Sequence, residues 1–169
     1  MGGAGMRLLA AAATLALFVL SSASARADCD HFKWPLAREK AWFAGSPEPI
    51  DAGTEIEVAD QAFALTLKPN DAAGYLLPLT KAAAAGTYGG VVKLASIPKG
   101  GLYEVTLSRE GWIDVIQNNA RARSRNVSRQ RDCAAMRKSV QFQLVQGPAA
   151  LQISGVEAPA VAFTLAAAP

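Results

Sequence analysis

The chain has 169 residues, a length that suits one globular domain better than two. It carries 17 Lys and Arg against 14 Asp and Glu, and removal of residues 1–27 would take away Arg7 and Arg26 and leave about 15 against 14. A nearly neutral chain argues against a nucleic-acid-binding protein, and we expect no nucleic-acid partner.

Residues 1–27 have the pattern of a secretory signal peptide. Arg7 supplies the positive charge, and Ala25-Arg26-Ala27 has the small residues of a cleavage site. The apolar run between them has about thirteen residues, fewer than the ~20 that span a bilayer. We therefore expect a mature protein that begins at Asp28, is periplasmic or secreted, and has no stable membrane insertion. Cleavage after Ala25 and an uncleaved membrane anchor are the alternatives.

Two cysteines, Cys29 and Cys133, remain in the mature chain. In an oxidising compartment an even number of cysteines predicts a disulfide, here between the mature N-terminus and a late loop. Two free thiols, or half of a metal site, are the competing interpretation.

Residues 28–50 are expected to form an N-terminal arm with a short helix over residues 34–45. Proline in the first turn and Gly45 at the C-terminal end are typical helix boundaries. Trp34, Arg38 and Trp42 are spaced to share one face of this helix. Two interpretations follow: the tryptophans pack the helix over the end of a sheet, or they form an aromatic platform for a ligand.

Residues 51–169 alternate apolar and polar side chains with a period of two, the pattern of half-buried strands. The clearest stretch is Gly100–Ile116, where two alternating runs flank Arg109-Glu110-Gly111 and predict a β-hairpin. Other expected strands are Thr54–Val58, Ala62–Leu67, Tyr75–Leu79, Val91–Ala95, Val140–Leu144, Leu151–Ser154 and Val161–Leu165.

Short strands with a turn every eight to twelve residues are typical of an all-β fold. We predict a two-sheet antiparallel β-sandwich of jelly-roll or immunoglobulin-like topology with a short N-terminal helix. A closed barrel is the alternative. The modest size of the expected inward-facing residues suits two sheets packed face to face, with no large internal cavity.

Arginines accumulate between the central strands and the last three strands. Six of them, followed by Lys138, are candidates for binding an anionic ligand or partner: Arg121, Arg123, Arg125, Arg129, Arg131 and Arg137. Guanidinium groups suit carboxylate, phosphate and sulfate groups. A solvated loop with ordinary salt bridges is the other interpretation.

Candidate catalytic residues are few. His31 is the only histidine, so the chain cannot supply a multi-histidine metal site, and we expect no metal, no cofactor and no catalytic triad. Calcium held by carboxylates stays open. A carboxylate pair for hydrolysis could involve Asp114, Glu104 or Glu110. Asp114 is the best of these, although a solvent-facing acid or a partner for a loop arginine is the plainer interpretation.

Several segments carry a resemblance to a family. They are Cys29–Leu36, Tyr103–Leu107, Trp112–Val115, Cys133 with Arg137–Val140, and Gln146–Gly155. Over nearly the whole mature chain the sequence resembles a group of small exported proteobacterial proteins, some of which are labelled homogentisate 1,2-dioxygenase. That label implies an iron held by histidines and a carboxylate, for which this chain offers only His31.

A second, looser resemblance rests on Gly-x-Tyr-x-Val-x-Leu at residues 101–107 followed by Trp-Ile-Asp-Val at residues 112–115. This succession is similar to the sandwich modules attached to secreted peptidases and glycan-active enzymes. It implies a binding role.

Three functional hypotheses follow. The first is an exported, non-enzymatic binding or accessory module, with an anionic glycan or an envelope protein as partner. The second is an enzyme, either the dioxygenase that the resemblance implies or a carboxylate-based hydrolase. The third is a structural envelope protein without a small ligand.

Overall fold

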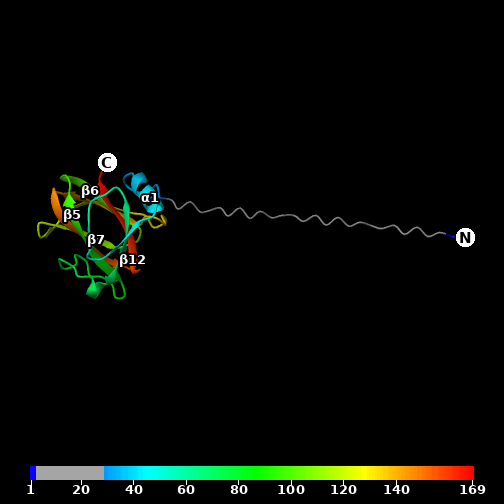
Figure 1. The fold of residues 1–169 in the computed structure, drawn as a ribbon, viewed down its shortest axis with the longest axis horizontal. Helices are drawn as coiled ribbons and strands as arrows, with labels where there is room; N and C mark the ends of the chain where they lie inside the picture. Colours follow the sequence, from blue (N-terminus) through cyan, green and yellow to red (C-terminus); the bar gives the residue numbers. More distant parts are fainter. Residues whose placement is uncertain (3–28) are drawn as a thin grey trace.

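The computed structural model describes residues 1–2 and 29–169 (Figure 1). Residues 3–27 of the predicted signal peptide, with both cleavage sites, lie outside the described residues. No helix in the described part of the chain combines the length and the apolar character needed to cross a bilayer.

Within the described residues the strands form two six-stranded sheets. Sheet A has the order β1 (Glu48–Asp51), β3 (Ala62–Thr66), β12 (Ala160–Ala167), β6 (Gly101–Leu107), β10 (Lys138–Leu144) and β9 (Ser124–Arg129). Sheet B has the order β2 (Glu55–Ile56), β5 (Tyr88–Ile97), β11 (Gly147–Val156), β7 (Trp112–Gln117) and β8 (Ala120–Arg121), and β4 (Lys68–Pro69) pairs with β5. The predicted all-β sandwich is confirmed. It is mixed, because β1 pairs with β3 and β2 pairs with β5 in parallel.

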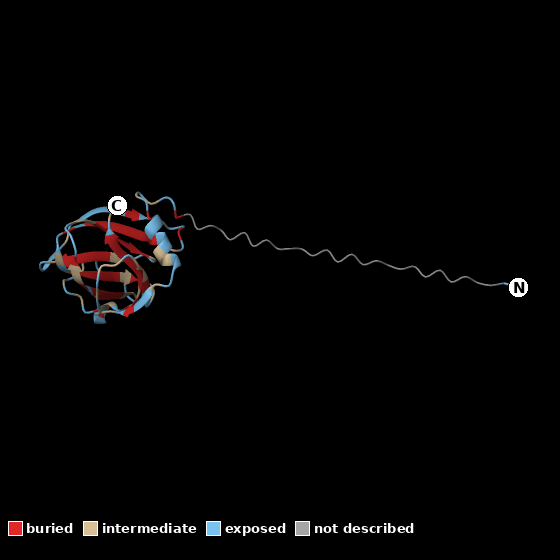
Figure 2. Ribbon diagram, turned by 45° about the horizontal axis from the view of Figure 1, so that its top comes forward, coloured by how far each residue is buried: buried red, intermediate tan, exposed pale blue. Residues whose placement is uncertain are grey.

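The core lies between the two sheets, as Figure 2 shows by the buried strands at the centre of the domain. Leu65, Val105 and Phe163 of sheet A face the interior together with Val92 and Leu151 of sheet B, and none of the five exposes any measurable surface. These positions are the apolar half of each alternating strand. Burying them removes apolar surface from water and supplies the main driving force for bringing the sheets together.

The predicted hairpin at residues 100–116 is wrong. β6 belongs to sheet A and β7 to sheet B, so the connection between them crosses from one sheet to the other. Alternation places Val105 and Val115 in the core in either arrangement, so the pattern cannot distinguish a hairpin from a crossing. Gly111 in the connection packs closely: a Cβ there would lie 2.9 Å from Val156 Cγ2 and 3.4 Å from the carbonyl oxygen of Ser154.

The N-terminal arm covers part of the outer face of sheet A. Its helix, α1, spans Ala37–Ala44 and lies on the outside of the sandwich (Figure 1). The Arg38 guanidinium donates to the carbonyl of Ala167, near the C-terminus, at 2.8 Å. The helix is shorter than predicted: Leu36 is its N-cap, so Trp34 and Pro35 lie outside it. Under the arm the polar positions of sheet A are buried, Thr106 and Ser139 at 0% exposure among them.

A second segment, residues 70–87, covers part of the outer face of sheet B and is termed the strap. It starts with a 3-10 turn at Asn70–Ala72, and the strand predicted at Tyr75–Leu79 does not form. The Gln152 side chain replaces strand pairing there: its oxygen accepts from Leu76 N at 3.0 Å, and its nitrogen donates to the Leu77 carbonyl at 3.0 Å. The Tyr75 ring lies against Gly89, where any side chain would overlap it.

Candidate functional site

One end of the sandwich gathers loops from three neighbouring strands of sheet A. In the pairing of β6, β10 and β9, Lys138 lies opposite Leu107 on one side and Arg129 on the other. The chain therefore leaves β6, leaves β9 and enters β10 at the same end. The connection after β6 meets the loop between β9 and β10 there, and Arg137 N donates to Leu107 O at 2.8 Å.

Together with the turn after β11, which carries Glu157, these loops line an open groove of about 710 Å³, termed the arginine groove. Four guanidinium groups and two carboxylates line it, together with Ser108 and Ala134: Arg109, Arg129, Arg131, Arg137, Glu110 and Glu157. Arg129 Nε lies 3.9 Å from Glu110 Oε2, and both side chains are about half exposed. Such a pair is weak in water. The excess of positive charge, and donors arranged in planar forks, suit an anionic group.

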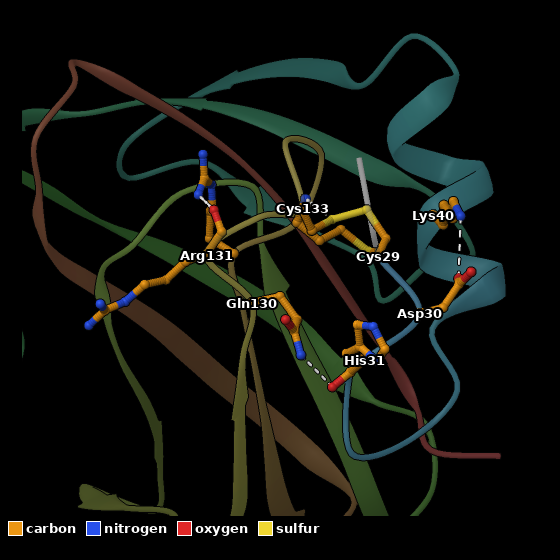
Figure 3. Close-up of a disulfide and its surroundings, with 9 residues drawn as sticks. Cys29, Asp30, His31, Lys40, Gln130, Arg131 and Cys133 are labelled. Carbon is orange, nitrogen blue, oxygen red and sulfur yellow. Dashed lines mark hydrogen bonds and ion pairs between the residues drawn. A yellow bond between two sulfur atoms is a disulfide. The ribbon is translucent and has the colours of Figure 1, made fainter. Parts of the chain in front are cut away.

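The loop that carries Arg131 and Arg137 is anchored from inside by the predicted disulfide. Cys29 and Cys133 are bonded, with their Cα atoms 4.7 Å apart. Cys133 is fully buried, and Met136 N donates to its Sγ at 3.2 Å. Figure 3 shows the Arg131 side chain directed away from the disulfide. A loop held in this way loses little conformational freedom when its arginines bind a ligand.

The N-terminal arm adds further contacts to this loop and to the strand before it. The Gln130 side-chain amide donates to the backbone carbonyl of His31 (Figure 3). Lys33 N donates to Ser128 Oγ at 3.0 Å. Trp34 and Phe32 pack on the disulfide and its neighbours. The tryptophan at position 34 therefore packs the arm onto the domain.

A second groove, of about 320 Å³, adjoins the arginine groove and is termed the tryptophan groove. Trp112 and Lys81 line it with residues 82–84, Gly111, Ser154 and Gly155, and it shares Glu110 and Arg129 with the arginine groove. The two grooves therefore meet at one ion pair.

Lys138 contacts Trp112 and is almost fully buried, with 3% exposure. Its Nζ lies 4.9 Å from the centroid of the indole ring and donates to the Gly111 carbonyl at 2.6 Å. Burial lowers the pKa of Lys138 to about 8, and the neighbouring Arg129 acts in the same direction. The ammonium group is thus held by a ring face and one carbonyl.

The remaining predicted arginines lie elsewhere. Arg121 is on β8, where its Nε lies 3.6 Å from Asp114 Oδ1 and its guanidinium donates to the Pro78 carbonyl. Arg123 and Arg125 are exposed, in and beside the edge strand β9. Arg109, in contrast, lines the arginine groove and was missed, because it is far from the arginine run in sequence and only the β6–β10 pairing brings it there.

The three candidate carboxylates are not brought together. Asp114 is on the outer face of sheet B, Glu104 is on the outer face of sheet A, and Glu110 is in the loop between them. Asp114 does not face solvent: it is 7% exposed and accepts a hydrogen bond from Thr80 Oγ1 at 3.0 Å. Its contact with Arg121 makes it the partner of a loop arginine, the plainer of the sequence-based interpretations.

The iron implied by the first resemblance is not fitted by the residues present. Across residues 29–169 no three His, Cys, Asp or Glu side chains are grouped so that they could hold a metal ion. His31, the only histidine of the chain, lies in the N-terminal arm beside the disulfide (Figure 3).

No protein-family model, no curated protein and no solved structure matches this chain. The functional argument therefore rests on the geometry of the two grooves.

Proposed function

We propose that the protein is an exported, non-enzymatic binding or accessory module whose arginine groove takes up an anionic group of a glycan. The observation that carries the proposal is the convergence of Arg109, Arg129, Arg131 and Arg137 on one groove. Paired N–H donors bind carboxylate, phosphate and sulfate groups with defined geometry. The disulfide-anchored loop supports the proposal because a preorganised site loses less entropy on binding.

The proposed location is the periplasm or the exterior of the cell, after removal of a signal peptide. The disulfide supports it, since such bonds persist in oxidising compartments and are rare in the cytosol. An envelope protein with an acidic surface is the alternative partner. An accessory role beside a secreted enzyme agrees with the second resemblance.

The test compares two double variants that remove the same charge. Arg109→Ala/Arg131→Ala removes two exposed arginines of the arginine groove, and Arg123→Ala/Arg125→Ala removes two exposed arginines outside it. We expect the first variant to elute from a heparin column at clearly lower salt than the wild type. The second variant should elute close to the wild type.

Equal shifts in the two variants would mean that only total charge matters, and the proposed groove would then have no specific role. Failure of the wild-type protein to bind heparin and other anionic glycans at low salt would contradict the proposal directly.

A further inference from the structure

We propose that the arginine groove and the tryptophan groove are two halves of one site, and that its ligand is an acidic saccharide. In this arrangement a sugar ring lies on Trp112, and a carboxylate or sulfate of the same or the next sugar reaches the arginines. The inference rests on the proposed function and specifies its ligand.

The first argument is continuity. Arg129 and Glu110 line both grooves, so the two grooves are adjacent and share these two residues. The ion pair between the two side chains is 3.9 Å long and half exposed, so it can open without a large loss of free energy. The two volumes, about 710 and 320 Å³, fall within the range of roughly 300–1,000 Å³ that small-ligand sites occupy.

The second argument is the chemistry around Trp112. Gly111 and Gly155 line the tryptophan groove beside it, and nothing lies within 4 Å of the position that a Cβ of Gly155 would take, so the groove is open there. The face of an indole ring is electron-rich and attracts groups of partial positive charge, which include the C–H groups on one face of a sugar ring. Trp112 Nε1 is buried and has no hydrogen-bond partner within residues 29–169. The N–H therefore serves as a probe of changes around the ring, and the ring itself is the proposed contact.

The third argument is the charge beside the ring. Lys81 is exposed on the strap with its Nζ 5.9 Å from the ring centroid, whereas Lys138 is buried with its Nζ 4.9 Å from the centroid. With Arg129 at the junction, every charged group that contacts the ring or lines the tryptophan groove is cationic except Glu110. An acidic sugar would bring negative charge to the exposed Lys81 and Arg129, whereas a neutral sugar would bring none.

The experiment titrates 15N-labelled full-length mature protein with trigalacturonate, a heparin-derived tetrasaccharide, neutral maltotriose and a short oligothymidylate. The indole N–H signal of Trp112 is identified by its loss in Trp112→Phe. We expect this signal to shift with at least one of the two acidic saccharides and not with maltotriose. The carboxylated and sulfated probes distinguish the two sources of negative charge.

Variants separate the two grooves. Trp112→Leu should weaken binding of the acidic saccharide about tenfold and leave the binding of inorganic sulfate unchanged. Trp112→Phe keeps a ring and should bind the saccharide nearly as well as the wild type. Arg109→Ala/Arg131→Ala should weaken the saccharide and sulfate alike, and Arg123→Ala/Arg125→Ala should weaken neither. Circular dichroism confirms that each variant is folded.

Three results would overturn the inference: full saccharide affinity in Trp112→Leu, binding of maltotriose as tight as that of the acidic saccharides, or tighter binding of oligothymidylate. If Trp112→Leu has no effect while Arg109→Ala/Arg131→Ala weakens binding, the single composite site is wrong and the proposed function stands. If neither variant has an effect, both are wrong.

Discussion

At the scale of single residues, Lys138 is a basic side chain that is almost fully buried. Its pKa is lowered from 10.5 to about 8, mainly by burial and then by the nearby Arg129 and Lys81, whereas Glu110 and Asp114 oppose the shift. The unfolded chain binds this proton up to about pH 10.5 and the folded chain only up to about pH 8. Between these values the unfolded state holds more protons, so the stability that Lys138 contributes rises with pH.

We therefore expect the difference in unfolding free energy, wild type minus Lys138→Met, to rise by up to about 3 kcal/mol between pH 8 and pH 10.5. Urea unfolding at four pH values across this range measures it. Lys93→Met, on an exposed position of β5, is the matched control and should show little pH dependence relative to the wild type. A constant difference for Lys138→Met would contradict the expectation.

Glu104 shows how far a single polar residue can depart from its sequence pattern. It alternates with core residues and is expected on a solvated face, yet it is 1% exposed beneath the N-terminal arm. Burial raises its pKa, and the hydrogen bond that Gln141 donates to Oε1 at 2.7 Å opposes the shift. Alternation identifies the face on which a residue lies, but not whether another segment covers that face.

At the scale of elements, the connection between β6 and β7 decides how the two sheets are joined. Gly111 lies where this connection passes over Val156, and a Cβ would approach Val156 Cγ2 to 2.9 Å. We expect Gly111→Ala to lower the unfolding free energy by about 1–3 kcal/mol, because the backbone has to shift to accept the methyl group. Gly101→Ala is the matched control, since nothing lies within 4 Å of its Cβ.

Urea unfolding of both variants measures the effect. Equal stability of the two variants would show that the close approach at Gly111 is not what requires a glycine there. Gly111 also lines the tryptophan groove, so the Trp112 indole signal should shift in Gly111→Ala and stay in place in Gly101→Ala.

At the scale of the whole molecule, the disulfide ties the N-terminal arm to the loop that presents the arginines. Cys29 and Cys133 are separated by 104 positions, and closing so long a loop restricts the unfolded chain strongly. We expect Cys29→Ser/Cys133→Ser to lower the unfolding free energy by about 2–5 kcal/mol. Hydrogen exchange should rise in residues 29–45 and 130–137 and change little in β5 and β11.

The same variant links the fold to the proposed site. If the disulfide preorganises the loop, the cysteine-free protein should elute from heparin at lower salt than the wild type while still folded. Unchanged stability and unchanged exchange in the arm would show that the other contacts of the arm suffice without the covalent bond.

Sequence reasoning recovered the features that depend on neighbouring residues. Alternation identified most of the longer strands and their apolar faces, and hence a sandwich, but it missed β1 and β9. The parity of the cysteines indicated the disulfide. The predicted start of α1 was wrong, because Pro35 lies outside the helix. The strand predicted at 75–79 was also wrong, because the backbone of the strap there bonds to the Gln152 side chain and not to a neighbouring strand.

The tertiary structure alone decided which strands share a sheet and which side chains share a groove. A strand offers the same hydrogen-bonding groups to any neighbour, so its own residues do not specify its partner, and a local pattern cannot distinguish a hairpin from a crossing between sheets. Arg109 joins Arg131 and Arg137 only because β6 pairs with β10 in one register. The amino-acid pattern thus determined that the chain forms two-faced strands with a cysteine cross-link, and the packing of distant strands determined where its charges meet.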